Sequence, residues 1–258
     1  ETFNVNISGH KAWYSGITIL PKDRVMLVDK TNKQCILLNN SHQVVTEYKL
    51  TGNLCDVCVM SDEEVAVSVF DEKKIQILSV RDDVISPVRT ITTKHRCYGI
   101  TTAGKGEMVV GGDCGNNKLC WSVIRDGREV NYSDQFYSSS GSYSCIAMNN
   151  SKTRVYVTVG NTNSIHCFNM ENKKQYTYSH DNLKWPFGVA VDRDDNIYVV
   201  GYNSHNIHQL SPEGCLIQVI TTGVPQNPCA ICFNNSNDTF IITNNSNESE
   251  NVHIFQLK

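Results

Sequence analysis

A short segment recurs about every 43 residues along this chain, and this repeat limits the folds that the chain can adopt. The six copies begin at Gly16, Asp56, Gly99, Cys145, Gly188 and Ala230, and their first residues lie 40, 43, 46, 43 and 42 residues apart. A period of about 40 to 50 residues with strand-like contents is typical of propeller blades. We therefore predict an all-β, six-bladed β-propeller with four antiparallel strands in each blade, forming a single domain over residues 1–258.

The fifth copy shows the strand pattern of a blade most clearly. Strand-like segments at 187–192, 197–200, 207–210 and 215–220 are separated by turns rich in Asp, Asn and Gly. The sixth copy ends after its third strand, whereas residues 2–7 precede the first copy and alternate between apolar and polar. An open sheet edge would leave backbone groups unpaired. Residues 2–7 are therefore predicted to supply the outer strand of blade six and close the ring.

Composition and charge narrow the class of protein. The chain has 23 Lys plus Arg against 26 Asp plus Glu, so it has no general attraction to nucleic acid or to membranes. Its eleven cysteines are odd in number and scattered, which favours reduced thiols in a cytoplasmic protein. Eight Asn-X-Ser/Thr sequons leave a secreted, glycosylated propeller as an alternative. Because the chain does not begin with Met, we expect a domain of a longer protein, with any oligomerisation through upstream regions.

The segment 185–207 reads Trp-Pro-Phe-Gly-Val-Ala-Val-Asp-Arg-Asp-Asp-Asn-Ile-Tyr-Val-Val-Gly-Tyr-Asn-Ser-His-Asn-Ile and resembles the NHL repeat. The other copies resemble it more loosely. The resemblance implies an NHL-like propeller such as the one that ends tripartite-motif (TRIM) proteins, where it recognises a partner or a ubiquitination target. No RING or B-box pattern of cysteines and histidines occurs in this chain. Any ubiquitin-ligase chemistry would therefore lie outside it.

Two Cys-X-X-Cys pairs and three histidines look like metal ligands at first. Cys55 and Cys58 lie in the inner strand of blade two, and Cys229 and Cys232 take the same places in blade six. Residues three apart in a strand point to opposite faces, so the sulfurs of each pair should diverge. The histidines share one place in the third strands of three different blades: His166, His208 and His253. We therefore expect no metal and no cofactor.

An enzyme would need a nucleophile with a base, or several acidic ligands around the central channel. Some six-bladed propellers, the lactonase-like hydrolases and the peptide-amidating lyases among them, hold calcium or zinc there. Among the six repeat positions only Asp56 is acidic, and the chain contains no nucleophile-elbow, His-Glu-X-X-His or phosphate-loop motif. The sequence therefore predicts a chain that is not an enzyme, with a metal-dependent hydrolase or lyase as a less favoured alternative.

The composition of the loops favours a binding function. The loop before each inner strand, here called a leading loop, should emerge on the same face as the companion loop between the second and third strands. Aromatic and amide side chains gather in these loops, a composition typical of recognition surfaces. The predicted binding face comprises Tyr14, Asn53, Phe70, Arg96, Tyr98, Tyr143, Trp185, Phe187, Tyr202, Asn203 and Asn227. We expect a protein or peptide partner there, and single-stranded RNA is the alternative.

Overall fold

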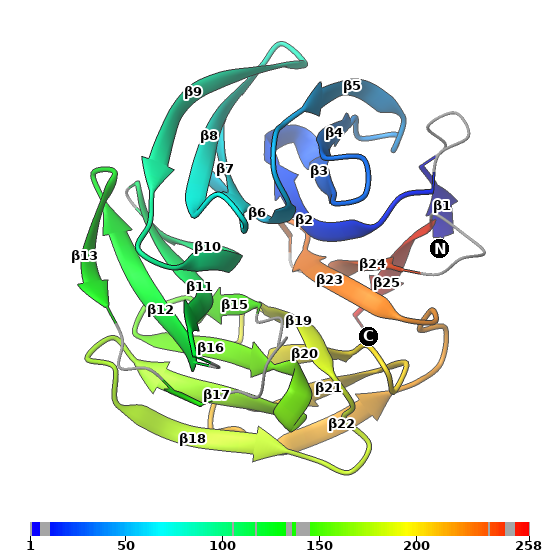
Figure 1. The fold of residues 1–258 in the computed structure, drawn as a ribbon. Coiled ribbons are helices and arrows are strands. Elements are labelled where there is room, and N and C mark those ends of the chain that lie inside the picture. The colour runs from blue at the N-terminus through cyan, green and yellow to red at the C-terminus, as the bar shows by residue number, and fades with distance from the viewer. Residues whose placement is uncertain are drawn as a thin grey trace.

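The chain folds into a ring of six small sheets around a central axis, as predicted (Figure 1). This computed structural model describes residues 2–5, 11–104, 106–116, 118–132, 136–137, 145–236, 238–245 and 251–257. Four of the sheets are meanders of four consecutive antiparallel strands. The sheet of blade 6 takes its fourth strand from the N-terminus, and that of blade 3 carries a short fifth strand, β14, beside β12. The inner strand of each blade faces the axis.

The strand bounds follow the repeat closely. Blade 1 contains β2 (Tyr14–Leu20), β3 (Arg24–Asp29), β4 (Gln34–Leu38) and β5 (Val44–Lys49). Blade 2 contains β6 (Leu54–Ser61), β7 (Glu64–Val69), β8 (Lys74–Arg81) and β9 (Val84–Thr92). Blade 3 contains β10 (Arg96–Gly104), β11 (Glu107–Gly115), β12 (Lys118–Arg125), β13 (Arg128–Tyr132) and β14 (Phe136–Tyr137).

Blade 4 contains β15 (Ile146–Met148), β16 (Arg154–Val159), β17 (Ser164–Asn169) and β18 (Lys174–Ser179). Blade 5 contains β19 (Pro186–Val191), β20 (Ile197–Gly201), β21 (Asn206–Leu210) and β22 (Leu216–Ile220). Blade 6 contains β23 (Pro228–Phe233), β24 (Thr239–Asn244), β25 (Asn251–Gln256) and the N-terminal β1 (Thr2–Asn4). In the described part of the chain the helical elements are two 3₁₀ turns, Pro21–Asp23 and Gly160–Thr162, and no helix there is long and apolar enough to span a membrane.

The ring is closed by the N-terminus, which confirms the prediction. Strand β1 pairs antiparallel with β25, and Phe3 lies opposite Val252 at the outer edge of blade 6 (Figure 1). The strand ends at Asn4, earlier than predicted, and residues 6 and 7 lie outside the described residues. Val5 follows the strand and is buried, and its carbonyl accepts a hydrogen bond from the Tyr14 hydroxyl at 3.3 Å. The first blade therefore holds the closing segment in place.

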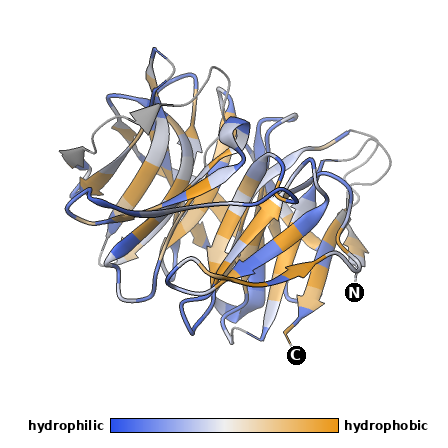
Figure 2. Ribbon diagram, turned by 90° about the horizontal axis from the view of Figure 1, so that it is seen from below, coloured by the Kyte–Doolittle hydropathy of each residue, from blue (hydrophilic) through white to orange (hydrophobic). Residues whose placement is uncertain are grey.

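The apolar core lies between neighbouring blades. The middle strands are largely buried, and β4 and β21 are buried along their whole length, whereas an outer strand such as β22 is mostly exposed. Figure 2 shows this arrangement as hydrophobic strands inside the ring and hydrophilic loops around it. Each of the clusters of buried side chains joins two adjacent sheets; one, for example, joins Met26 of blade 1 to Val67 of blade 2. Burial of apolar surface is the main stabilising contribution to such a fold.

The contacts between inner strands alternate around the ring. Blades 1, 3 and 5 begin with Gly16, Gly99 and Gly188, and a Cβ on these glycines would lie 2.7, 2.8 and 3.1 Å from the Cα of the equivalent residue in the next blade. Only glycine permits so close a backbone approach. The other three contacts use a hydroxyl of the second strand, which donates to a backbone carbonyl of the next blade. These bonds are Ser68 to Tyr98 (2.7 Å), Thr158 to Phe187 (2.8 Å) and Thr243 to Tyr14 (2.7 Å).

Candidate functional site

Leading and companion loops meet on one face of the ring, here called the leading face, as the sequence predicted. In four blades the companion loop donates a backbone hydrogen bond to the carbonyl of the leading loop. In blade 1 the amide of Lys30 donates to Trp13 (2.9 Å), and in blade 5 that of Tyr202 donates to Trp185 (3.1 Å). Blades 2 and 6 repeat the contact at 2.9 Å each. The companion loops thus brace the leading loops.

Four predicted residues line one pocket on this face. Trp185, Phe187, Tyr202 and Asn203 surround a cavity of about 260 Å³ together with Trp13, which the sequence analysis did not include. Trp13 directly precedes Tyr14, the aromatic residue that was chosen for this loop. Tyr14 is instead fully buried, so only Trp13 of these two neighbouring residues lines the pocket.

The other predicted residues lie elsewhere on the face. Phe70 and Tyr98 stack with their ring centroids 4.3 Å apart, and the Arg96 guanidinium lies 5.3 Å from the Phe70 centroid. Asn53 donates its side-chain amide to Asp71 at 3.0 Å. The remaining two residues are Asn227, whose backbone amide donates to His205, and Tyr143, which lies outside the described residues. The structure thus groups the predicted residues into two separate aromatic clusters, and a binding role for either stays a prediction.

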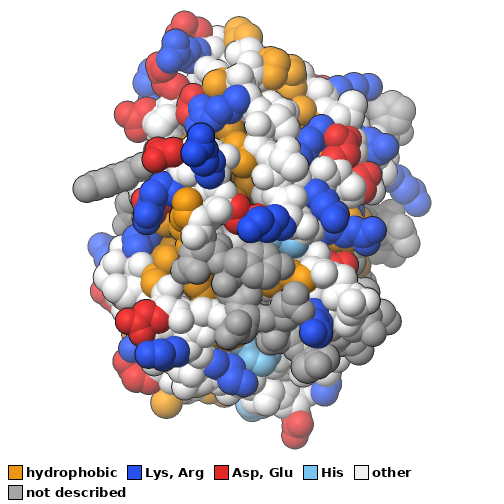
Figure 3. Space-filling model, turned by 60° about the vertical axis from the view of Figure 1, so that its left-hand side comes forward, with side chains coloured by type: hydrophobic (Ala, Val, Ile, Leu, Met, Phe, Trp, Pro, Cys, Tyr) orange, Lys and Arg blue, Asp and Glu red, His pale blue; other side chains and the backbone are white. Residues whose placement is uncertain are grey.

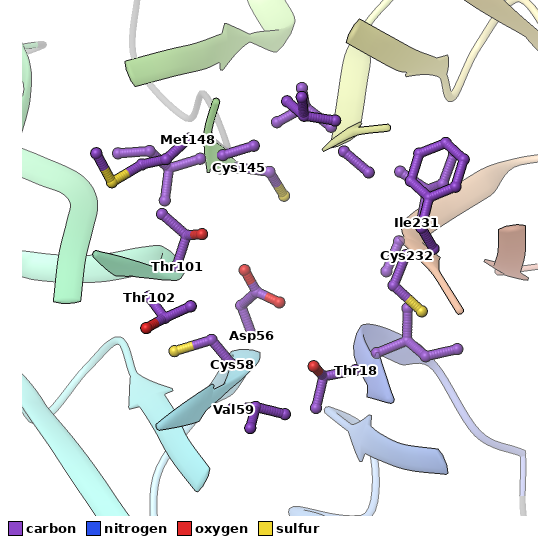
Figure 4. Close-up of a pocket in the computed structure, with 18 of the residues that line it drawn as sticks. Thr18, Asp56, Cys58, Val59, Thr101, Thr102, Cys145, Met148, Ile231 and Cys232 are labelled. Atoms are coloured by element: carbon purple, nitrogen blue, oxygen red, sulfur yellow. The ribbon is translucent and has the colours of Figure 1, made fainter. Parts of the chain in front are cut away.

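A second cavity occupies the central channel. It measures about 400 Å³ and is lined by all six inner strands. Figure 4 shows Asp56 and Cys145 turned toward this space, and Cys58 also lines it. The cavity extends to the turns between first and second strands, where Asn235 and Lys152 line it. These turns lie on the face opposite the leading face. The sequence analysis did not anticipate a cavity that reaches this side.

Asp56 is the one acidic side chain among the lining residues that the structure describes. Its carboxylate accepts backbone hydrogen bonds from Val57 at 2.9 Å and from Ile100 in blade 3 at 3.1 Å. Burial raises the pKa of the carboxyl to about 7, while these two amides act in the opposite direction. Part of the Asp56 side chain remains accessible from the cavity.

The thiols of the channel are not suited to nucleophilic attack. Burial raises the pKa of Cys58, Cys145 and Cys232 well above the ordinary value, so all three stay protonated at neutral pH. As predicted, the Cys-X-X-Cys sulfurs diverge: Cys58 and Cys232 line the channel, whereas Cys55 and Cys229 donate to backbone carbonyls of their leading loops.

Lactonase-like propellers hold calcium or zinc in the central channel. Such ions need several carboxylate, imidazole or thiolate ligands around one point. In the described part of the chain no three His, Cys, Asp or Glu side chains gather in this way. Asp56 stands alone, and both its oxygens already accept backbone amides. The described residues therefore do not fit a resident metal ion, and no reaction step is assigned to one.

The three repeat-related histidines lie in separate blades and have separate partners. His166 contacts the hydroxyls of Ser164 and Thr177, both at 3.1 Å. His208 contacts the Tyr178 hydroxyl at 2.7 Å, and His253 contacts Thr2 of the closing strand at 3.2 Å. Burial lowers the pKa of His166 and of His208 to about 4, so both stay neutral at physiological pH.

One pair of cysteines departs from the expectation of reduced thiols. Cys114 and Cys120 form a disulfide across the hairpin of β11 and β12, with a Cα–Cα distance of 6.2 Å. The other nine cysteines are free. The two cysteines are not directly opposed, because Cys120 pairs in register with Gly112. Cys114 lies two residues farther along β11, at the register shift between Asp113 and Gly115.

Charge on the surface is mixed. Figure 3 shows lysines and arginines interspersed with aspartates and glutamates over the side of the ring that lies on the left of Figure 1. Several charged side chains of the chain are paired, such as Arg81 with Glu63 at 2.6 Å and Arg89 with Glu64 at 3.8 Å. This view therefore shows no broad cationic patch of the kind that phosphate backbones require.

Comparison with known proteins identifies a family. A family model described as "SMP-30/Gluconolactonase/LRE-like region" matches residues 92–246, more than half of the chain. No curated protein sequence matches the chain. The family match agrees with the propeller predicted from the NHL-like repeat, but it does not show the tripartite-motif context.

Several solved structures share the architecture. Luciferin-regenerating enzyme is 15% identical, with a TM-score of 0.74 over 98% of this chain and 94% of that chain. A streptogramin B lyase is 17% identical, with a TM-score of 0.72 over 100% and 87%. A catalytically inactive virginiamycin B lyase from Staphylococcus aureus, solved with quinupristin, is 16% identical, with a TM-score of 0.70 over 100% and 89%. At these identities the likeness shows the fold alone.

The prediction that this chain is not an enzyme is wrong. The family whose model matches more than half of the chain is named after enzymes, gluconolactonase among them. The sequence argument failed because it looked for a nucleophile motif or a cluster of acidic ligands. A lone carboxyl in a channel gives neither signal, although Asp56 was visible as the single acidic residue at a repeat position.

Proposed function

Because this chain belongs to the SMP-30/gluconolactonase/LRE-like family, we propose that it is an enzyme whose reaction takes place in the central channel. The observation that carries the proposal is the Asp56 carboxyl, which points into a cavity of about 400 Å³ (Figure 4). Its pKa of about 7 suits general acid–base catalysis, which works best when the pKa lies near the operating pH. The cavity volume falls in the range of pockets that hold small molecules, roughly 300 to 1,000 Å³.

The substrate class that fits is a small neutral ester, with a lactone as the first candidate. In the proposed reaction the Asp56 carboxylate removes a proton from a water molecule as the water oxygen attacks the ester carbonyl. The carbonyl electron pair moves to its oxygen and then returns, breaking the bond to the ring oxygen. The leaving alkoxide takes the proton from Asp56, so one ester and one water yield one acid and one alcohol. Hydroxyls of Thr18, Thr101 and Thr102, which line the same cavity, can donate to the substrate oxygens.

Hydrolysis of a panel of sugar-derived and aliphatic lactones, followed by acid release, tests this proposal. We expect ring opening by the wild-type protein with a pH dependence that inflects near 7. The Asp56→Asn variant should lose about 100-fold or more of that rate. Asp62→Asn, a change at an exposed turn residue, is the matched control and should leave the rate unchanged. Equal rates for wild type and Asp56→Asn would contradict the proposed role of Asp56.

We also propose that the leading face binds a protein or peptide partner. Support comes from the pocket that Trp185, Phe187, Tyr202 and Asn203 form with Trp13. Selection of displayed random peptides on the wild-type protein, with counter-selection on a Tyr202→Ala/Asn203→Ala variant, tests this second function. We expect enriched sequences that require the pocket. An absence of enrichment, or capture of single-stranded RNA that weakens steeply with salt, would contradict it.

A further inference from the structure

Four aromatic rings converge on the pocket of the leading face from two different blades. Trp13 comes from the leading loop of blade 1, Trp185 from the leading loop of blade 5, and Phe187 from the start of strand β19 in blade 5. The centroid of Phe187 lies 6.5 Å from that of Trp13 and 6.1 Å from that of Tyr202 in the companion loop. Phe187 is buried and forms the floor, whereas the other three rings are half-buried and form the walls. The four rings thus surround a cavity of about 260 Å³ that stays open.

Hydrogen bonds hold Trp185 and Tyr202, two of the pocket walls, in place. Trp185 has a φ of +52°, a left-handed conformation that a bulky residue rarely adopts. Its amide donates to the Asn163 side chain at 2.8 Å, and its carbonyl accepts from Tyr202 at 3.1 Å. The Tyr202 hydroxyl accepts from Asn245 at 3.1 Å. A pocket held in this way loses little conformational entropy when a ligand enters, which favours affinity.

Charge and size limit the ligand. Among the described residues that line the pocket none is charged, and the Lys30 ammonium lies 4.6 Å from the Trp13 ring centroid. That ammonium would repel a cationic ligand at the same ring, which argues against an aromatic cage for methylated amines. The volume lies below the usual range for whole small-molecule ligands and suits a single side chain. Asn203 is exposed at the rim and offers an amide to a polar group.

We infer that this pocket takes one uncharged aromatic side chain, a tyrosine in the first instance, from a peptide partner. The inference rests on the proposed binding role of the leading face and names the group that is recognised there. The incoming ring would pack against Phe187 between Trp13 and Tyr202, in the offset or edge-to-face arrangements that aromatic rings prefer. Its hydroxyl would lie at the rim near Asn203.

Titration with N-acetyl-tyrosinamide, followed by tryptophan fluorescence, tests the inference. Two of the chain's three tryptophans line the pocket, and the third, Trp121, is fully buried. We expect a saturable change with this probe and none with N-acetyl-leucinamide or tetramethylammonium. Saturable binding of either of these two in place of the tyrosine probe would overturn the inference.

Two variants of Tyr202 distinguish the contribution of its aromatic ring from that of its hydroxyl. Tyr202→Phe and Tyr202→Leu both remove the hydrogen bond to Asn245, but only Tyr202→Phe keeps the aromatic wall. We expect Tyr202→Phe to bind like the wild type and Tyr202→Leu to bind about tenfold more weakly. Tyr48→Leu makes the same change on the outer strand β5, away from the pocket, and should bind like the wild type; thermal unfolding checks that each variant is folded. Equal affinity of the two Tyr202 variants would overturn the inference. If the probe fails while selected peptides still need the pocket, the aromatic-ring inference falls and the leading-face proposal stands.

Discussion

The carboxylate of Asp56 in blade 2 accepts a hydrogen bond from the backbone amide of Ile100 in blade 3, at 3.1 Å. The same side chain faces the central cavity and has a pKa raised by burial to about 7. One group therefore joins two blades and changes its charge near neutral pH. Its titration should be visible both in the stability of the fold and in any chemistry of the channel.

Asp56 should make the protein less stable as pH rises from about 4 to 7. A carboxyl whose folded pKa exceeds its unfolded value holds more protons in the folded state across that interval, so the unfolding free energy falls with rising pH and then levels off. Urea unfolding at pH 5 and pH 8 measures this effect. Relative to Asp56→Asn, the wild type should lose stability by about 1.4 kcal/mol for each pH unit in the interval. Parallel pH profiles for the two proteins would contradict the raised pKa, and Asp62→Asn should follow the wild type.

Val5 should be essential for ring closure. The side chain is buried beside the closing strand, so Val5→Asp places an unpaired carboxylate in an apolar site and should cost about 3 kcal/mol or more. Val44→Asp makes the same chemical change on the exposed outer strand β5 and should cost less than about 0.5 kcal/mol. Chemical denaturation of both variants measures the difference. Similar losses would show that the closing segment does not stabilise the fold.

Gly99 should not tolerate a methyl group. A Cβ there would lie 2.7 Å from the Ile146 nitrogen, and neither backbone can move without disturbing an inner strand. Gly99→Ala should therefore destabilise the fold by about 1 to 3 kcal/mol. Gly104→Asn is the control, because Gly104 has a φ of +87° and open space around it, and asparagine tolerates the left-handed region better than other residues. A harmless Gly99→Ala substitution would show that the blades can separate at this contact.

Tyr178 should stabilise blades 4 and 5 through its hydroxyl, which lies 2.7 Å from Nδ1 of His208. Tyr178→Phe would leave that buried nitrogen without its partner, at a cost of about 1 to 3 kcal/mol. Tyr48→Phe provides the matched control, because Tyr48 is only half-buried and packs against the blade 1–2 core. Unfolding free energies at pH 7, where His208 is neutral, give the comparison. Equal stabilities of the two variants would contradict a contribution from the hydroxyl.

The architecture could be predicted from the sequence because it depends on local patterns that recur. The spacing of the repeat positions gave six blades, and the apolar alternation of residues 2–7 predicted the pairing of β1 with β25. Blade five was predicted almost strand by strand, since the turns around 193–196 and 211–214 separate its strands clearly.

The site was harder to predict because it depends on distances between blades. Trp13 and Tyr14 are neighbours in sequence, and nothing in that dipeptide tells which ring is buried and which lines the pocket. Asp56 was recognised as unusual, but its pKa depends on how completely the ring surrounds it. The Cys114–Cys120 disulfide likewise depends on the register of one hairpin. Such features are settled by tertiary packing rather than by composition.

The alternating contacts between blades have a consequence for how a ring of this kind can change in size. A glycine contact such as Gly16 against blade 2 is always followed by a hydroxyl contact such as Ser68 against blade 3. A ring in which glycine contacts and hydroxyl contacts strictly alternate must have an even number of blades. Adding or deleting one blade would place two contacts of the same kind, glycine or hydroxyl, next to each other in the ring. By this parity, blades can be added or removed without a mismatched contact only in pairs.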